Sequence, residues 1–180
     1  MAGLKSGKQK AESGGNKTMA CNHRTANYPI GTVSSGTMRE EDLIPDFCYE
    51  LKNLAKQTGI CNHKTRAKHL RTVREIEKRM ESEDYFESDA AGYDLNETLF
   101  DALNCYAGPY FYFGSHPGDG SDYGFWLTEF IEDDFDGLKV SDSSEIPAKY
   151  RGEVLIVNDH GNMTLAVKTS RSLREVWSIV

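Results

Sequence analysis

The hydrophobic pattern of this chain changes its period once, near Gly108 and Pro109, and that change constrains the fold most. Before it, apolar residues recur every three or four positions, which is the period of a helix with one buried face. After it, short aromatic and β-branched runs stand between turn residues, as in β-strands. Helices first and strands last are typical of an α+β fold.

Three helices are predicted before Gly108. The first begins at a capping box, in which Thr37 and Glu40 satisfy each other's backbone N–H groups, and its main part covers residues 45–57. The second covers residues 64–80 and the third residues 93–106, each with one apolar stripe. We expect these stripes to form the core.

The strands are predicted after Pro109. Residues 110–113 and 123–127 form a hairpin with a long glycine-rich tip, and four further strands cover residues 138–141, 153–158, 163–168 and 174–180. The unbroken apolar run at residues 154–157 indicates a central strand that is covered on both faces. The sequence therefore predicts about three N-terminal helices packed on a roughly six-stranded antiparallel sheet, in one α+β domain over residues 36–180.

Residues 1–35 are polar and have no hydrophobic periodicity, so they are predicted to form a flexible arm. No apolar run is long enough to cross a membrane, and residues 1–20 lack the apolar stretch of a secretory signal. The four cysteines have uneven spacing and do not indicate a disulfide framework. We expect a cytoplasmic protein that does not contact the membrane.

Charge is distributed very unevenly along the chain. Residues 1–80 hold 15 Lys and Arg against 8 Asp and Glu, whereas residues 81–145 hold 17 Asp and Glu and a single cation, Lys139. Scattered carboxylates with few cations imitate a nucleic-acid backbone. The hypothesis is therefore that the chain binds a host protein with a basic surface. A solvated face that aids solubility is the alternative. The candidate partner-binding residues are the acids after the hairpin and three aromatic anchors: Glu129, Glu132, Asp133, Asp134, Asp136, Tyr112, Tyr123 and Trp126.

Two turns form a possible second site. One carries His116, Asp119 and Asp122, and the other carries Asp159 and His160. Histidines and carboxylates on neighbouring loops suit a metal ion or acid–base catalysis, but turns also use these residues for conformational reasons. Because no nucleophile–base pair is visible, neither catalysis nor a cofactor is predicted.

Two Cys-Asn-His tripeptides, at Cys21–His23 and Cys61–His63, each offer one sulfur and one nitrogen ligand for zinc. Their spacing is not that of a standard zinc site, so no metal is predicted. The second helix is strongly basic and is the one plausible phosphate-binding surface, although it could instead pair with the acidic half or with a second copy of the chain. Its cations are Lys64, Arg66, Lys68, Arg71, Arg74, Lys78 and Arg79.

Five segments resemble an uncharacterised family of small proteins from bacteriophages and other mobile elements. They are GTMREEDLIP at 36–45, FGSHPGDG at 113–120 with GFW at 124–126, GEVLIVNDHGN at 152–162, and WSIV at 177–180. The resemblance covers residues 36–180 and supplies no catalytic residues. It implies an accessory phage protein, a class in which anti-CRISPR and antirestriction inhibitors are common.

Together, charge and resemblance favour a non-enzymatic protein that inhibits a nucleic-acid-handling host defence protein through an acidic surface. Two alternatives stay open. One is a small metal-assisted enzyme that uses the His/Asp turns, and the other is a nucleic-acid binder that uses the basic helix.

Overall fold

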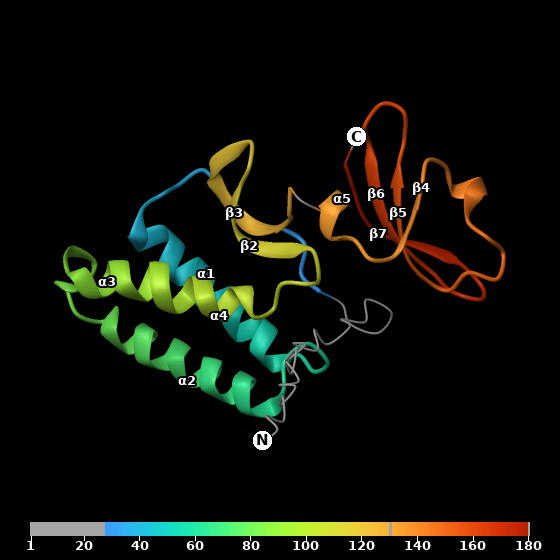
Figure 1. Ribbon diagram of the computed structural model, residues 1–180. Coiled ribbons are helices and arrows are strands. Elements are labelled where there is room, and N and C mark those ends of the chain that lie inside the picture. The colour runs from blue at the N-terminus through green and yellow to red at the C-terminus, as the bar shows by residue number, and fades with distance from the viewer. Residues whose placement is uncertain (1–27, 130, 180) are drawn as a thin grey trace, which may run out of the picture.

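The computed structural model describes residues 28–129 and 131–179, and it is a mixed α+β structure. Figure 1 shows helices α1 to α4 on one side, a small sheet lying over them, and a second sheet beside them, with α5 between the two sheets. None of the described helices is both long and apolar enough to cross a membrane.

Helix α1 (Glu40–Lys56) runs through Pro45, so the prediction that the main part of the first helix starts at residue 45 is wrong. Proline at this position removes one backbone bond of the helix. Two effects compensate for that loss. Three acids in the first turn complement the positive end of the helix dipole, and Leu43, Ile44 and Phe47 are buried.

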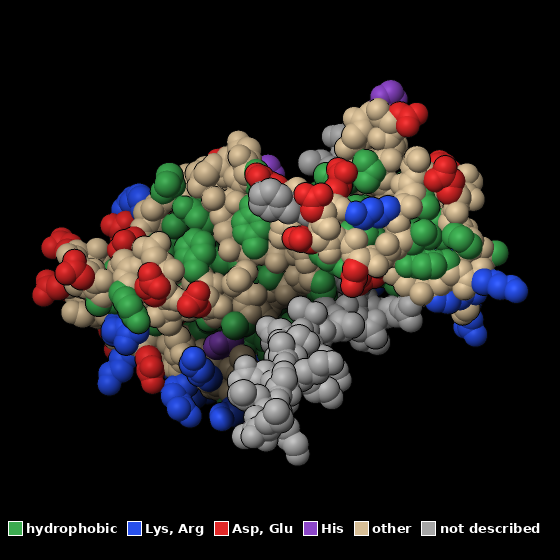
Figure 2. Space-filling model, in the orientation of Figure 1, with side chains coloured by type: hydrophobic (Ala, Val, Ile, Leu, Met, Phe, Trp, Pro, Cys, Tyr) green, Lys and Arg blue, Asp and Glu red, His purple; other side chains and the backbone are tan. Residues whose placement is uncertain are grey.

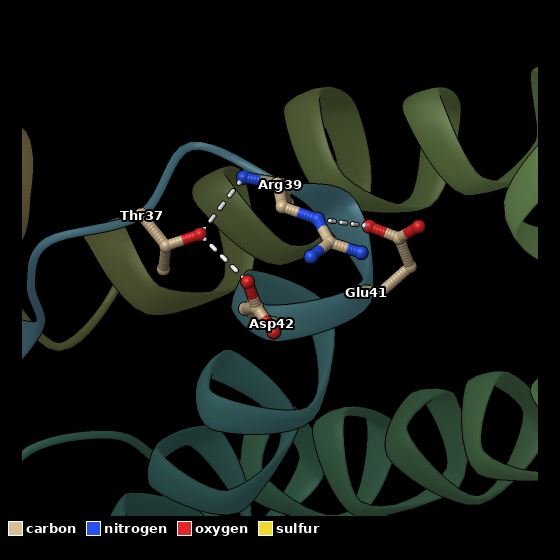
Figure 3. Close-up of polar contacts among 4 residues, drawn as sticks. All are labelled: Thr37, Arg39, Glu41 and Asp42. Atoms are coloured by element: carbon tan, nitrogen blue, oxygen red, sulfur yellow. Dashed lines mark hydrogen bonds and ion pairs between the residues drawn. The ribbon is translucent and has the colours of Figure 1, made fainter.

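The predicted capping box at the start of α1 is also wrong. The Thr37 hydroxyl accepts from the Arg39 N–H at 3.1 Å and donates to the Asp42 carboxylate at 2.7 Å (Figure 3). The Arg39 guanidinium donates to Glu41 at 3.1 Å, so Glu40 takes no part in this network. The N-cap residue of α1 is Arg39 and not Thr37, so the Thr37 hydroxyl accepts from the N–H of Arg39, before the helix, instead of from that of Glu40.

Helix α2 (His63–Arg79) agrees with the predicted second helix to within one residue. The Asn62 side chain caps it by accepting from the Thr65 N–H at 2.9 Å. Val73 and Ile76 are fully buried in the core that α1 and α2 share. Leu70 and Met80 are partly buried against this core and Ala67 is exposed, so the predicted stripe is confirmed only in its central part.

The third predicted helix starts earlier than expected and is interrupted. A 3₁₀ turn, η1 (Tyr85–Glu87), precedes α3 (Asp89–Tyr93), a π-helical segment η2 (Asp94–Leu99) and α4 (Phe100–Asn104). Asp94 is 3% exposed and accepts two bonds from Arg79, both at 2.8 Å. It also accepts from the Tyr85 hydroxyl at 2.9 Å. This buried network ties the end of α2 to the π-helical segment.

The first sheet has three antiparallel strands in the order β1-β3-β2: β1 (Gly31–Ser34), β2 (Phe111–His116) and β3 (Asp119–Leu127). The hairpin tip is much shorter than predicted, because most of the glycine-rich segment continues the strands. The sequence placed β1 in the flexible arm, and its pairing with β3 corrects that placement. A Cβ at Gly124 would lie 2.2 Å from the Gly31 carbonyl oxygen, so β1 can approach β3 only because residue 124 has no side chain.

The second sheet has the order β4-β5-β6-β7, with β4 (Leu138–Val140), β5 (Gly152–Val157), β6 (Met163–Lys168) and β7 (Leu173–Ile179). A short 3₁₀ turn, η3 (Ser143–Glu145), lies in the connection from β4 to β5, which pair in parallel. The predicted single antiparallel sheet is therefore wrong in two respects. The prediction of a central strand is confirmed, because Val154 and Leu155 point to opposite faces of β5 and both are fully buried.

One face of the β2–β3 hairpin contributes to two hydrophobic cores. Phe113 and Phe125 pair across the strands and belong to the core with the helices. Phe111 and Leu127 pair on the same face and belong to a second core, whose other members are Ile131, Phe135, Leu155 and Leu165. The hairpin thus joins the helical half to the second sheet.

Candidate functional site

The candidate acidic residues lie on and around α5 (Ile131–Asp134). Ile131 and Phe135 are 1% and 5% exposed, and both belong to the second core. With those two side chains fixed inside, the acids between and beside them stay exposed to solvent: Glu129, Glu132, Asp133, Asp134 and Asp136. Buried apolar residues therefore hold a short acidic helix on the surface.

The wider acidic segment, residues 81–145, is almost entirely exposed. Of its 17 Asp and Glu residues, only the buried Asp94 and the half-buried Asp122 are not exposed. The one cation of the segment, Lys139, contacts the backbone carbonyl of Glu132 and so lies beside α5. Figure 2 shows acidic side chains around α5 and over the end of α3, with basic ones along α2 below them.

The three candidate aromatic anchors do not share one face of the hairpin. Tyr112 and Trp126 are cross-strand partners on the face opposite Phe113 and Phe125. Tyr123 lies on the inner face instead, with ring centroids 5.8 Å from Phe47 and 5.9 Å from Phe100. Tyr123 therefore belongs to the helical core, and two anchors remain on the outer face.

A pocket of about 340 Å³ lies between the hairpin and the second sheet. It brings together Trp126 and Glu129, which the sequence proposed as partner-binding residues, and His116, which it proposed as a turn residue. Trp177 and Met163 of the second sheet complete the apolar lining. The two tryptophans of the chain thus line a single pocket.

The aromatic side of this pocket is held in place by hydrogen bonds. The Trp126 indole N–H donates to the Gly114 carbonyl at 3.0 Å. The His116 ring meets the Trp126 ring edge-on, with centroids 4.7 Å apart and an interplanar angle of 83°. His116 Nδ1 accepts from the Gly118 N–H at 3.0 Å, which orients the imidazole. Both rings are therefore already oriented before any ligand arrives.

The other candidate turn residues have different roles, and Asp119 stabilises its own turn. Asp119 accepts from the Ser121 N–H at 2.9 Å and from its hydroxyl at 2.8 Å, and these bonds lower the pKa of Asp119. Asp122 accepts from Thr32 at 3.2 Å, which links β3 to β1. Asp159 and His160 are exposed in a turn that the Asn158 side chain organises. The described residues include no cluster of three or more His, Cys, Asp or Glu that could hold a metal ion.

The two Cys-Asn-His tripeptides cannot be compared in space, because Cys21 and His23 lie outside the described residues. The Cys61 thiol donates to the Cys105 carbonyl at 3.2 Å, so it is engaged with the end of α4. Burial raises the pKa of Cys61 and raises that of Cys48 to about 12. A thiol whose pKa is raised is a poorer nucleophile and metal ligand at neutral pH.

The basic helix α2 uses two of its seven cations for structure. The Arg66 guanidinium donates to the Gln57 carbonyl at 2.7 Å, and Arg79 pairs with Asp94. The remaining five are exposed, and their side chains have no hydrogen-bond or ion-pair partner in the described part of the chain: Lys64, Lys68, Arg71, Arg74 and Lys78. These five cations therefore have no structural role within the described part of the chain.

Sequence reasoning did not select Trp177 or Met163 as site residues. The available signal was the scarcity of tryptophan, since a chain with two of them often uses them at interfaces.

Comparison of the chain with protein-family models, with curated proteins and with solved structures finds no match.

Proposed function

We propose that this protein is a non-enzymatic binding protein of phage-like origin. Its acidic surface, centred on α5, binds a basic surface of a host defence protein that handles nucleic acid, of the restriction or CRISPR type, and inhibits it. The phage-like origin rests on the sequence resemblance, and the basic partner rests on charge.

One observation carries the proposal: the exposed carboxylates of residues 81–145 are opposed by a single cation that already contacts α5. Like charges this dense repel one another and oppose the compact state, so a function at this surface accounts for their presence. Such a surface also repels phosphates, and the proposed partner is therefore a protein and not DNA or RNA.

The test is a charge reversal at α5. The variant Asp133→Lys, Asp134→Lys, Asp136→Lys alters three exposed side chains around the helix and leaves Ile131 and Phe135 in place. It also removes the hydrogen bond that Tyr110 donates to Asp136 at 2.8 Å, so the fold of the variant is checked by circular dichroism. The matched control, Glu81→Lys, Glu83→Lys, Asp84→Lys, makes the same change in net charge at three exposed positions after α2. Both variants and the native protein are used to capture proteins from host lysate, which are identified by mass spectrometry.

We expect the native protein and the control variant to capture one basic, nucleic-acid-handling protein, and the α5 variant to lose it. Capture should weaken steeply with salt, because the Debye length falls from about 10 Å at 0.1 M to about 3 Å at 1 M. Equal loss in both variants would mean that only net charge matters, and unchanged capture by the α5 variant would refute the proposed surface.

A second candidate function is nucleic-acid binding by α2, which is favoured by five exposed cations that have no partner among residues 28–129 and 131–179 and are suited to phosphate contacts. The double variant Arg71→Glu, Arg74→Glu tests it in a gel-shift assay with duplex DNA at low salt. If native protein and variant both fail to shift DNA, the basic stripe has no such role.

A further inference from the structure

The pocket between the hairpin and the second sheet is suited to a positively charged group. Its walls include the indole rings of Trp126 and Trp177. The His116 imidazole packs against the Trp126 ring in a T-shaped arrangement. Indole has a negatively charged face that attracts ammonium and guanidinium groups within about 6 Å of the ring. Since Trp126 is tied to Gly114, little side-chain entropy is lost when a ligand binds there.

Charge around the pocket selects a cation over the other ligands that aromatic rings accept. The Glu129 carboxylate is part of the lining and is exposed, and no Lys or Arg is among the described lining residues. The α5 acids begin three positions after Glu129 in the chain. A nucleobase would stack on the same rings, but its phosphate would then meet this row of carboxylates.

We infer that this pocket binds an arginine or lysine side chain of the partner protein. The inference rests on the proposed function and adds to it a specific contact: one cationic side chain sits between Trp126 and Trp177, with Glu129 pairing its charge. The surrounding acids provide long-range attraction, whereas the pocket provides the buried centre that interface hot spots require.

The test uses arginine amide with its α-amine acetylated, and the equally acetylated citrulline amide as an uncharged analogue of nearly the same shape, both added to the full chain at constant ionic strength. Binding is followed by the two indole N–H signals in an NMR titration, since both tryptophans of the chain line the pocket. We expect arginine amide to shift both signals with saturation in the millimolar range, and citrulline amide to shift neither.

Two variants and one control locate the binding site. Trp177→Leu should lower the affinity for arginine amide about three- to thirtyfold, which is the loss expected for one cation–π contact. Glu129→Gln changes an exposed position and keeps the fold, and it should lower the affinity for arginine amide several-fold. Tyr93→Leu removes an aromatic side chain that is 65% exposed on the helical half, and it should change nothing.

Three results would overturn the inference: equal shifts with arginine and citrulline amides, stronger shifts with a mononucleotide, or an unchanged affinity in both Trp177→Leu and Glu129→Gln. Each of these differs from failure of the proposed function. If the pocket does not bind arginine amide while reversal of the α5 acids still abolishes capture, the proposed acidic surface is supported and this contact is not. If the pocket binds arginine amide while that reversal has no effect on capture, the cation-binding pocket is supported and the proposed acidic surface is refuted.

Discussion

Replacing Asp94 with alanine should destabilise the protein more than any other change of an acidic residue in residues 81–145. The carboxylate is almost completely buried, and it accepts three hydrogen bonds, two from Arg79 and one from Tyr85. Its removal leaves a hydroxyl and a guanidinium without their acceptor. Burial and the neighbouring Asp94 raise the pKa of Tyr85, so the phenol stays protonated and loses a real hydrogen bond in the variant.

The size of the effect follows from the exposure of each partner. Breaking a fully buried ion pair costs about 3–5 kcal/mol. Because the Arg79 side chain is 44% exposed, water replaces part of the lost interaction, and about 2 kcal/mol remains for this pair. The Tyr85 hydroxyl adds about 1 kcal/mol. The total of about 3 kcal/mol corresponds to a fall in Tm of about 6–12 °C for a protein of this size.

Thermal and urea unfolding, followed by circular dichroism, measure this loss. The matched control is Asp101→Ala, which removes an exposed carboxylate from α4 and should stay within about 0.5 kcal/mol of the native protein. An Arg79→Met, Asp94→Ala double-mutant cycle should show a coupling of about 1–2 kcal/mol. If Asp94→Ala matched the Asp101→Ala control, the network would not stabilise the helical half and the reasoning would be refuted.

Three further predictions concern other parts of the molecule. Gly124→Ala should displace β1, because its Cβ would clash with Gly31, and hydrogen exchange of residues 31–34 should become at least about tenfold faster. The control Gly120→Ala, which has open space around its Cβ, should not alter this exchange. Cys48 should resist Ellman's reagent in the native state, since it is 2% exposed and its pKa is raised to about 12, whereas the exposed Cys105 should react within minutes; fast labelling of Cys48, mapped by mass spectrometry, would contradict this. Burial raises the pKa of Glu50, so the folded state binds its proton more tightly and stability falls as pH rises from the ordinary carboxyl pKa through the raised one. Glu50→Gln should therefore raise Tm at pH 7 and have a smaller effect at pH 4, and the opposite order in calorimetry would be inconsistent with a desolvated carboxylate.

The helices were the most predictable part of the fold because their signals are local. Val73 and Ile76 follow the helical period, and the Asn62 cap joins two residues that are only three positions apart, Asn62 and Thr65. The start of α1 was harder, because the sequence does not show which residue takes the N-cap position. Arg39 takes it instead of Thr37, and the capping box does not form.

The strands were predictable one by one, but their pairing was not. Val154 and Leu155 identified an interior strand, yet nothing in the run indicated that β4 would pair with it in parallel. Strand β1 was missed because four residues that begin with glycine have no alternation, and its partner is distant in the chain. The pocket shares this difficulty: Trp126 and Trp177 lie on different sheets, and only the packing around Phe111 and Leu127 brings them together.

The pairing of β1 with β3 has a consequence for synthesis on the ribosome. Strand β1 is made before α1, and β3 follows α4, so the whole helical half separates Gly31 from its partner Phe125. Closing so long a loop is entropically costly for an unfolded chain, although the cost grows only slowly with length. Folding of the helices brings the two ends together first. The emerging protein therefore carries an unpaired β1 edge until residue 127 has left the exit tunnel, and during that interval this segment is open to chaperones and to other nascent chains.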